Sequence, residues 1–316
     1  MKATAKAHVN IALIKYWGKK DIELNLPLTS SLSFTLDKFY TKTTVHYKKE
    51  LIEDQLYIDQ RYITGPEYER VTKYLSKIRQ MYNIPYYAMI ESENYVPKKA
   101  GVASSSSAFA ALALAATRAY GIDLSEKELS SLARLGSGSA ARSIYGGFAF
   151  WNEGYDHLSS YAEPFNGFED MAVLVCMVDD REKKISSRDA MLELTKNEEN
   201  KNDWIENTND FIEQIKEAFI NDDFDTVGGI AESHAMLMHY YMQEDGIDYL
   251  TDQSFKIIDL TEKLRGQGFP VYATMDAGPN VKILTKKEYI KDVIGSYEKL
   301  AKVTVCYKGE GAKIIW

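Results

Sequence analysis

Residues 97–108 read Pro97-Lys-Lys-Ala-Gly-Val-Ala-Ser-Ser-Ser-Ser-Ala108, a turn of glycine and small residues that leads into an alanine-rich helix. Small side chains let the backbone approach a ligand closely. The start of a helix presents free amide donors and the positive end of the helix dipole, so phosphate is the expected ligand. The Walker pattern GxxxxGK[ST] is absent. The residues alone leave two interpretations open: a phosphate loop, or a small-residue helix that packs against a sheet.

The uncharged run from Ala100 to Thr117 is about as long as a minimal membrane span. It contains four consecutive serines and is built mostly from alanine, which favours a loop that enters a tightly packed helix. The first residues, Met1 to His8, have no apolar core of signal-peptide length. We therefore expect a cytoplasmic protein.

On both sides of this helix, the sequence alternates between segments with strand-like and helix-like patterns. Before it we predict strands at 3–9, 28–36, 41–48 and 86–91, a hairpin at 55–64 and a helix at 67–82. After it we predict a helix from Ser125, where Ser125 and Glu128 form a capping box, and a strand at 171–178. Beyond these we predict helices at 187–195, 200–220, 223–242 and 251–266, and strands at 270–275, 280–284, 302–307 and 312–316. These patterns predict an α+β protein with mostly antiparallel sheet, divided near residue 180 into units 1–180 and 181–316 that meet at a cleft.

The composition is that of an ordinary globular protein, with 316 residues, 45% hydrophobic and 27% charged. A formal net charge of −8 argues against a broad nucleic-acid surface, although a basic pocket for a small anion stays open. Cys176 and Cys306 lie in apolar stretches without a CxxC pattern or a histidine partner, so we expect two buried, reduced thiols.

Four further blocks gather polar and charged side chains at turns. They are Asn10–Lys19, Gly136–Gly147, Lys183–Met191 and Tyr272–Lys282. Each has an ordinary structural interpretation. In the same order, these are a surface turn, a helix cap with a surface arginine, a helix start with a serine cap, and an aspartate at a turn. Gly136–Gly147 also has a chemical interpretation, because a donor-rich turn suits a diphosphate and a guanidinium suits a carboxylate.

The phosphate-loop pattern Pro-x-x-x-Gly-Val-Ala-Ser-Ser-Ser resembles that of the galactokinase, homoserine kinase, mevalonate kinase and phosphomevalonate kinase (GHMP kinase) superfamily. Together with the four blocks, which occur in family order from Ala3 to about Lys282, it resembles the mevalonate diphosphate decarboxylases. The resemblance implies the GHMP-kinase-like two-domain α+β fold. Its N-terminal half is like ribosomal protein S5 domain 2, its C-terminal half is a ferredoxin-like α+β unit, and the active site lies in the cleft between them.

The resemblance also implies a nucleotide site, with ATP as co-substrate and Mg²⁺ near Ser104 or Ser105. The residues that it assigns to ATP are Ser92, Asn94, Gly101, Val102, Ala103, Ser104, Ser105, Ser106, Ser107 and Lys183. Relatives usually have small residues where this chain has Lys98 and Lys99. These lysines either add attraction for ATP or are simply solvated, and both interpretations stay open.

For the second substrate, the resemblance assigns binding to Asn10, Tyr16, Lys19, Ser137, Gly138, Ser139, Arg142, Ser187 and Arg188. It assigns catalysis to Asp276, Lys19 and Arg142, with Asp276 orienting the reacting hydroxyl or accepting its proton. Paired lysine and arginine cations in one cleft should lower the pKa of Asp276 and keep it ionised. Met238-His239 has a family counterpart, but the following segment 240–249 lacks the double-proline loop of relatives.

The implied reaction is the ATP-dependent decarboxylation of (R)-5-diphosphomevalonate to isopentenyl diphosphate, ADP, phosphate and CO2, in the mevalonate pathway of isoprenoid biosynthesis. Two alternatives compete with it. One is a mevalonate or phosphomevalonate kinase that stops after phosphoryl transfer, and the other is an inactive relative that only binds ligand or a partner. We expect a small-molecule substrate, no nucleic acid, no membrane and, as in relatives, a homodimer.

Overall fold

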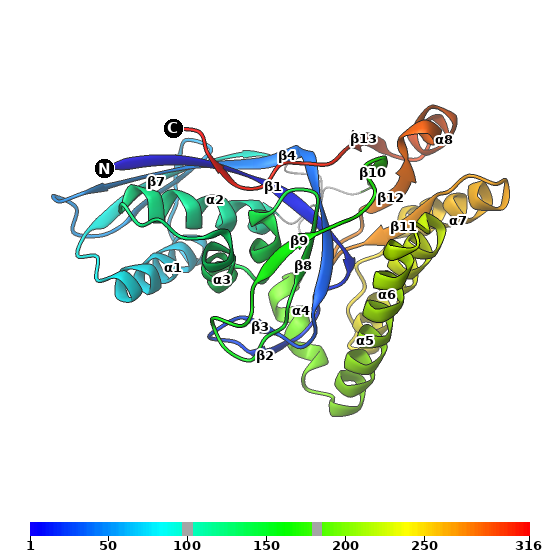
Figure 1. Ribbon diagram of the computed structural model, residues 1–316, viewed down its shortest axis with the longest axis horizontal. Helices are drawn as coiled ribbons and strands as arrows, with labels where there is room; N and C mark the ends of the chain where they lie inside the picture. Colours follow the sequence, from blue (N-terminus) through cyan, green and yellow to red (C-terminus); the bar gives the residue numbers. More distant parts are fainter. Residues whose placement is uncertain (97–103, 179–184) are drawn as a thin grey trace.

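The computed structural model describes residues 1–96, 104–178 and 185–316, with the backbone alone at Ser104 (Figure 1). Two sheets and their helices form the molecule, and the chain ends lie side by side because β14 returns to pair with β1. The backbone N–H of Thr4 donates to the Trp316 carbonyl at 2.6 Å.

The first sheet is built on two long antiparallel strands, β1 and β4. Its strands are β1 (Lys2–Ile14), β4 (Ser31–Lys48), β5 (Gln55–Ile58), β6 (Arg61–Tyr62), β7 (Tyr87–Tyr95), β8 (Phe148–Trp151), β9 (Ala162–Phe165) and β14 (Lys313–Ile314). The order is β14-β1-β4-β7-β5-β6, with β8 on β4 and β9 on β8. Every pair is antiparallel except β5 with β7. Along β4, Phe39, Thr41, Thr43 and Val45 are buried, which is the period of two expected for a sheet with one covered face.

Three helices cover one face of this sheet (Figure 1). They are α1 (Pro66–Tyr82), α2 (Ser104–Ala119) and α3 (Glu126–Gly136), and α3 is followed by the 3-10 helix η1 (Gly138–Ile144). Helix α2 lies against β1 and β4. Its alanines, among them Ala110, Ala113 and Ala116, are fully buried, so the helix backbone approaches the sheet closely. This packing places the start of α2 beside the turn that follows α3.

The second sheet has four antiparallel strands in the order β11-β12-β10-β13. They are β10 (Met171–Met177), β11 (Tyr272–Met275), β12 (Val281–Lys286) and β13 (Lys302–Cys306). The helices of this half are α4 (Ser187–Leu194), α5 (Glu198–Ile220), α6 (Phe224–Glu244), α7 (Asp252–Gly266) and α8 (Ile290–Glu298), with a short 3-10 turn η2 (Lys287–Tyr289) before α8. A small ribbon of β2 (Lys19–Asp21) and β3 (Leu26–Pro27) extends from the end of β1.

The two halves share a hydrophobic core. Val9 and Ile11 of β1 belong to the same buried cluster as Val173 of β10 and Ile230 of α6. The backbone N–H of Lys15, just after β1, donates to Nδ1 of the buried His234 in α6 at 2.9 Å. The end of β1 is therefore fixed by both halves, and the residues that follow it enter the space between them.

Most of the predicted elements are confirmed, including the capping box of Ser125 and Glu128 at the start of α3. The predicted strands 28–36 and 41–48 are one strand, β4, because its backbone stays extended through Asp37 and Lys38. Elements β8, β9 and α8 were not predicted. The division near residue 180 stays a prediction, and β10, which ends just before it, is hydrogen-bonded into the second sheet.

Both cysteines are buried and free, as expected. In the ranges that the structure describes, no helix combines the length and the apolar character that crossing a membrane requires.

Substitutions of two neighbouring glycines in α6, Gly228 and Gly229, would test how this helix packs on β11. A Cβ on Gly228 would lie 2.1 Å from a ring carbon of Tyr272, whose hydroxyl donates to Asp225 at 2.8 Å, whereas a Cβ on Gly229 would meet nothing within 4 Å. We expect Gly228→Ala to lower the free energy of unfolding by about 1–3 kcal/mol through overpacking. Gly229→Ala should raise it by up to about 1 kcal/mol through helix propensity. Urea denaturation measures both, and equal effects of the two substitutions would contradict the packing described.

Candidate active site

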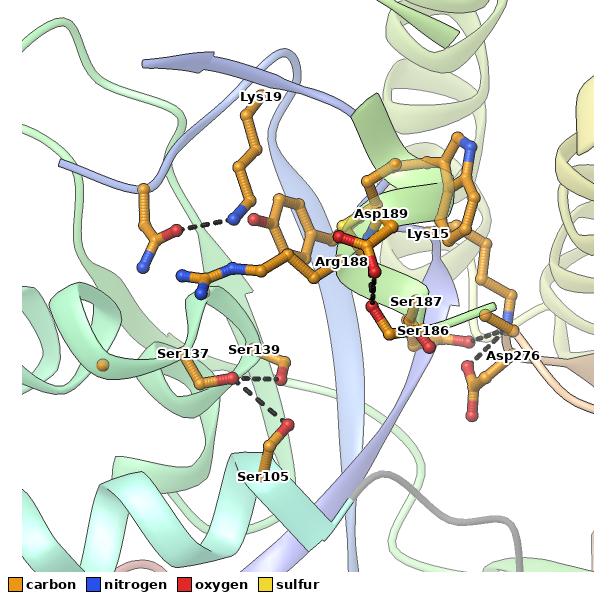
Figure 2. A pocket seen from close by; sticks show the side chains of 18 of the residues that line it. Lys15, Lys19, Ser105, Ser137, Ser139, Ser186, Ser187, Arg188, Asp189 and Asp276 are labelled. Atoms are coloured by element: carbon orange, nitrogen blue, oxygen red, sulfur yellow. Dashed lines mark hydrogen bonds and ion pairs between the residues drawn. The ribbon is translucent and has the colours of Figure 1, made fainter. Parts of the chain in front are cut away.

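A cavity of about 620 Å³ lies where the end of β1, the turn after α3, the start of α4 and the turn after β11 meet (Figure 2). Its lining contains five cations and two carboxylates among the described residues, so it is basic in an acidic protein. The charged residues are Lys15, Lys19, Arg70, Arg142, Arg188, Asp189 and Asp276. The uncharged polar residues are Asn10, Tyr16, Asn25, Ser105, Ser137, Ser139, Ser186 and Ser187.

Asp276 lies at one end of the cavity, in the turn that follows β11, and each of its oxygens is bound to a lysine. Lys15 Nζ is 3.1 Å from Oδ1, and Lys282 Nζ is 3.2 Å from Oδ2. Each lysine side chain is 1% exposed, whereas that of Asp276 is 24% exposed. Lys15 also donates to the Ala12 carbonyl at 2.7 Å. The two ion pairs fix the carboxylate while leaving one edge of it open to the cavity.

The surroundings set the charge of this group. Burial alone would raise the pKa of Asp276, but Lys15 and Lys282 outweigh burial and hold its pKa well below the usual range. Burial lowers the pKa of Lys15 to about 8, in spite of the opposing effect of Asp276. The low pKa predicted from the sequence is confirmed. The lysines that contact Asp276 are, however, Lys15 and Lys282, and Lys19 has another partner.

Arg142, in η1, is buried and held by neutral acceptors. Its Nε and Nη2 each donate to Asn10 Oδ1 at 3.3 Å, and its Nη1 donates to Ser31 Oγ. The Asn10 amide donates in turn to the Ser139 carbonyl at 2.9 Å and to Ser143 Oγ at 2.7 Å, which orients its oxygen toward Arg142. Neutral acceptors position the guanidinium without cancelling its charge, so Arg142 is prepared for an anionic ligand.

Three further cations gather at the other end of the cavity: Lys19, Arg70 and Arg188. Lys19 Nζ donates to Asn25 Oδ1 at 2.7 Å, and Figure 2 shows Lys19 and Arg188 on the side of the cavity away from Asp276. Burial lowers the pKa of Lys19 to about 8, and repulsion from Arg188 and Arg70 adds to this effect. Within residues 1–96, 104–178 and 185–316, none of the three forms an ion pair with a carboxylate. Such a group of cations is a site for a polyanion.

The turn after α3 contributes hydroxyl groups beside Tyr16. Ser137 Oγ donates to Ser105 Oγ at 3.3 Å, which joins the turn to the first residues of α2 (Figure 2). A Cβ on Gly138 would lie 2.6 Å from the Tyr16 ring, so only glycine allows this approach. The Tyr16 hydroxyl is buried and has no partner among the described residues. A ligand oxygen would satisfy this group.

The residues predicted to bind ATP are only partly described. Ser105 lines the cavity, and the backbone of Ser104 begins α2. The side chains of Ser92, Asn94 and Ser107 bond to β4 instead: Ser92 Oγ lies 3.1 Å from Thr43 Oγ1, and Thr41 Oγ1 lies 3.2 Å from Asn94 Oδ1 and 2.7 Å from Ser107 Oγ. Ser106 is buried. Lys98, Lys99, Gly101, Val102, Ala103 and Lys183 lie outside the described residues, and the nucleotide assignment stays a prediction.

Lys15, Lys282 and Arg70 line or border the cavity but were not predicted as site residues. A lysine inside an apolar run, as in Ile11–Trp17 and Val281–Leu284, is a usable signal, because lysine is seldom fully buried without a partner. Arg70 carries no such signal, since a cation on an amphipathic helix is usually solvated.

His239 is buried in α6, and burial together with Lys15 lowers its pKa to about 4, so it is neutral at pH 7. In the segment 240–249, which lacks the double-proline loop of relatives, α6 continues as far as Glu244.

Comparisons with known proteins agree with this geometry. The family model described as Diphosphomevalonate decarboxylase-like N-terminal domain matches residues 7–162, and that described as Mevalonate 5-diphosphate decarboxylase C-terminal domain matches residues 173–310. A diphosphomevalonate decarboxylase of Ganoderma lucidum is 34% identical, over 93% of this chain and 80% of that protein. A phosphomevalonate decarboxylase of Haloferax volcanii is 29% identical, over 93% of this chain and 91% of that protein.

Solved structures show the same similarity. The crystal structure of mevalonate diphosphate decarboxylase from Staphylococcus aureus has a TM-score of 0.95 and 39% identity, covering 100% of this chain and 98% of that one. A structure described as MDDEF in complex with MVAPP, AMPPCP and magnesium has a TM-score of 0.95 and 38% identity, covering 100% and 99%.

Proposed function

The chain belongs to the diphosphomevalonate decarboxylase family, and on this premise we propose that it converts (R)-5-diphosphomevalonate and ATP into isopentenyl diphosphate, ADP, phosphate and CO2. The observation that carries the proposal is the division of charge in one cavity. An ionised carboxylate, Asp276, lies at one end between two lysines, and Lys19, Arg70 and Arg188 lie at the other. That division matches a substrate with a reacting hydroxyl near one end and a diphosphate at the other.

The first step makes a leaving group. A tertiary hydroxyl leaves poorly, so its oxygen first attacks the terminal phosphorus of ATP. Asp276 accepts the hydrogen bond of this hydroxyl and thereby aims its oxygen. Because the pKa of Asp276 is held low by Lys15 and Lys282, the carboxylate is a weak base. It takes the proton only as the new O–P bond forms. The step therefore relies on positioning and charge neutralisation, as phosphoryl transfer generally does.

The second step forms the alkene. The C3–O bond breaks and its electron pair leaves with phosphate, which makes C3 positive. The electrons of the C1–C2 bond become the C2=C3 double bond, and the carboxylate carbon leaves as CO2. Arg142, whose charge is uncompensated by Asn10 and Ser31, would hold the carboxylate so that the breaking bonds are aligned.

ATP and Mg²⁺ fit the described residues. The start of α2 lies beside the hydroxyl-rich turn, and Ser105 faces the cavity. Among the described residues, no cluster of three or more histidine, cysteine or acidic side chains could hold a metal. Mg²⁺ would therefore rely on nucleotide phosphates and on the hydroxyl of Ser104 or Ser105, in keeping with its preference for few protein ligands. Bound Mg²⁺ would neutralise part of the phosphate charge during the transfer.

Several further features belong to the same proposal. We include the remaining ATP contacts assigned from the resemblance, a division into units 1–180 and 181–316, a homodimeric assembly and a cytoplasmic location. The division is supported by the presence of two sheets with separate helices.

The reaction is tested by product analysis. With mevalonate diphosphate and ATP, we expect one ADP and one CO2 for each isopentenyl diphosphate formed, measured by coupled ADP assay and trapped radiolabelled CO2. Mevalonate 5-phosphate serves as the comparison substrate and should release far less CO2. Formation of ADP without CO2 would instead favour the kinase, and absence of ADP with every mevalonate ester would favour a ligand-binding relative.

The pKa values of the two lysines predict a dependence on pH. Lys15 and Lys19 both have a pKa lowered to about 8, and in the proposed reaction both act as cations. Their protonated fraction is high at pH 7 and is lost as the pH rises through about 8. We therefore expect kcat/KM for mevalonate diphosphate to be near its maximum at pH 7 and to fall steadily above pH 8. Initial rates at low substrate concentration between pH 7 and 10 give this profile. A kcat/KM that stays constant to pH 10 would show that neither lysine acts as a cation in substrate capture.

A further inference from the structure

A buried histidine that the proposed reaction does not use lies directly behind Lys15. His234 is fully buried in α6, and its ring is stacked on the ring of Trp204 in α5, with centroids 4.8 Å apart. It does not line the cavity. Its hydrogen bonds, however, lead toward the cavity and not only into the core.

Lys15 is the first residue beyond the paired part of β1. The pairing of β1 with β4 ends at Ile14 and Leu32, so the backbone N–H of Lys15 lies outside this ladder. Leaving a buried N–H without an acceptor is unfavourable. This N–H donates to Nδ1 of His234 at 2.9 Å. His234 therefore fixes the backbone at the point where the chain leaves the sheet and enters the cavity.

The contacts of His234 define which ring nitrogen carries the proton. A backbone N–H can only donate, so Nδ1 is the unprotonated acceptor and the proton of the neutral ring is on Nε2. Nε2 lies 3.0 Å from Oγ1 of Thr208 in α5, which accepts its hydrogen bond. Burial, together with a smaller effect of Lys15, lowers the pKa of His234 to about 3, so the ring is neutral at pH 7. A protonated ring would direct an N–H at the Lys15 N–H and lose the bond.

The side chain of Lys15 carries this anchoring on to the reacting end. Its Nζ lies 3.1 Å from Asp276 Oδ1 and donates to the Ala12 carbonyl at 2.7 Å. A shift of the Lys15 backbone would therefore move the cation that contacts the carboxylate. Displacement of a reacting group by about 1 Å can lower a rate by about a hundredfold.

The neighbouring substrate-binding candidates have anchors of their own. The Tyr16 ring packs edge-to-face on Trp151 with centroids 4.8 Å apart, and Lys19 Nζ donates to Asn25 Oδ1 at 2.7 Å. Loss of the bond to His234 should therefore affect the reacting end more than it affects ligand binding.

We propose, on the basis of the proposed function, that His234 is a positioning residue for phosphoryl transfer. Its Nδ1 holds the Lys15 backbone so that the Lys15 ammonium stays on Asp276, and Thr208 fixes the tautomer that this requires. Neither His234 nor Thr208 takes part in bond making or breaking.

The test compares His234→Leu with His234→Asn, since both remove the ring but only asparagine keeps an acceptor near the position of Nδ1. We expect His234→Leu to lower the single-turnover rate of ADP formation about 10- to 100-fold. Its Kd values for ATP and mevalonate diphosphate, measured by calorimetry, should stay within about threefold of the wild type. His234→Asn should keep the rate within about threefold, although both variants lose the stacking on Trp204 and should melt at a lower temperature.

Phe211→Leu is the matched control for packing. The Phe211 ring lies 5.3 Å from the His234 ring, edge-to-face, and forms no part of the hydrogen-bonded chain. This variant should lower the melting temperature and leave the rate of ADP formation unchanged. Equal rates in His234→Leu and His234→Asn, or a loss of rate in Phe211→Leu as large as in His234→Leu, would overturn the positioning role.

Magnetic resonance separates this inference from the proposed function. In ¹⁵N-labelled wild type at pH 7, the His234 ring, assigned by its absence from His234→Asn, should have an unprotonated Nδ1 and a protonated Nε2. If the wild type forms no ADP, the proposed function fails, and hydrogen exchange of the Lys15 amide still decides the anchoring. Exchange should be faster in His234→Leu than in His234→Asn, and equal exchange or a protonated Nδ1 would reject the role.

A second pair of variants applies if His234→Leu does not fold. Thr208→Val removes the acceptor of Nε2 with little change of shape, whereas Thr208→Ser keeps it. We expect Thr208→Val to lower the rate of ADP formation at least about threefold, as for loss of one buried hydrogen bond, and Thr208→Ser to retain it. Equal rates in these two variants would show that the tautomer of His234 does not matter for the reaction and would reject the proposal.

Discussion

The site depends on one carboxylate held between two buried lysines. Asp276 and Lys282 belong to the second sheet and its turn, whereas Lys15 comes from the end of β1 in the first. The paired charges are costly to separate in a buried environment, because an unpaired buried ion is strongly unfavourable. The same interaction that sets the charge of Asp276 therefore joins the halves at the cavity. The bond from the Lys15 backbone to His234 and the shared core along β1 support this alignment.

The two ends of the cavity therefore differ in how their charged side chains are paired. Near Asp276, the ion pairs with Lys15 and Lys282 keep the carboxylate ionised. In the proposed reaction this carboxylate would orient a hydroxyl rather than act as a strong base. At the other end, Lys19, Arg70 and Arg188 form no ion pair with a carboxylate in the described ranges. Their positive charge is therefore available to bind an anionic ligand. Binding and chemistry are thus assigned to separate groups of side chains within one pocket.

Much of the fold was predictable because its signals are local. The alanine-rich helix, the capping box at Ser125 and the alternation along β4 are read from neighbouring residues. Asp276 and Arg142 were assigned to catalysis through resemblance, and both line the same cavity. The partners of Asp276 could not be read this way, because Lys15 lies 261 residues from it in sequence. Arg70 could not be identified for a similar reason, since its contacts with Gly136 of α3 and Phe109 of α2 arise only in the folded chain.

In the proposed reaction Asp276 acts on the reacting hydroxyl while other residues bind the ligands. The most direct measurement is the single-turnover rate of ADP formation in Asp276→Asn, with calorimetry showing that ATP and mevalonate diphosphate are both bound. We expect binding of both ligands within about threefold of the wild type and a rate of ADP formation lower by about a hundredfold or more. A variant that binds both ligands and keeps most of its turnover would contradict this role of Asp276.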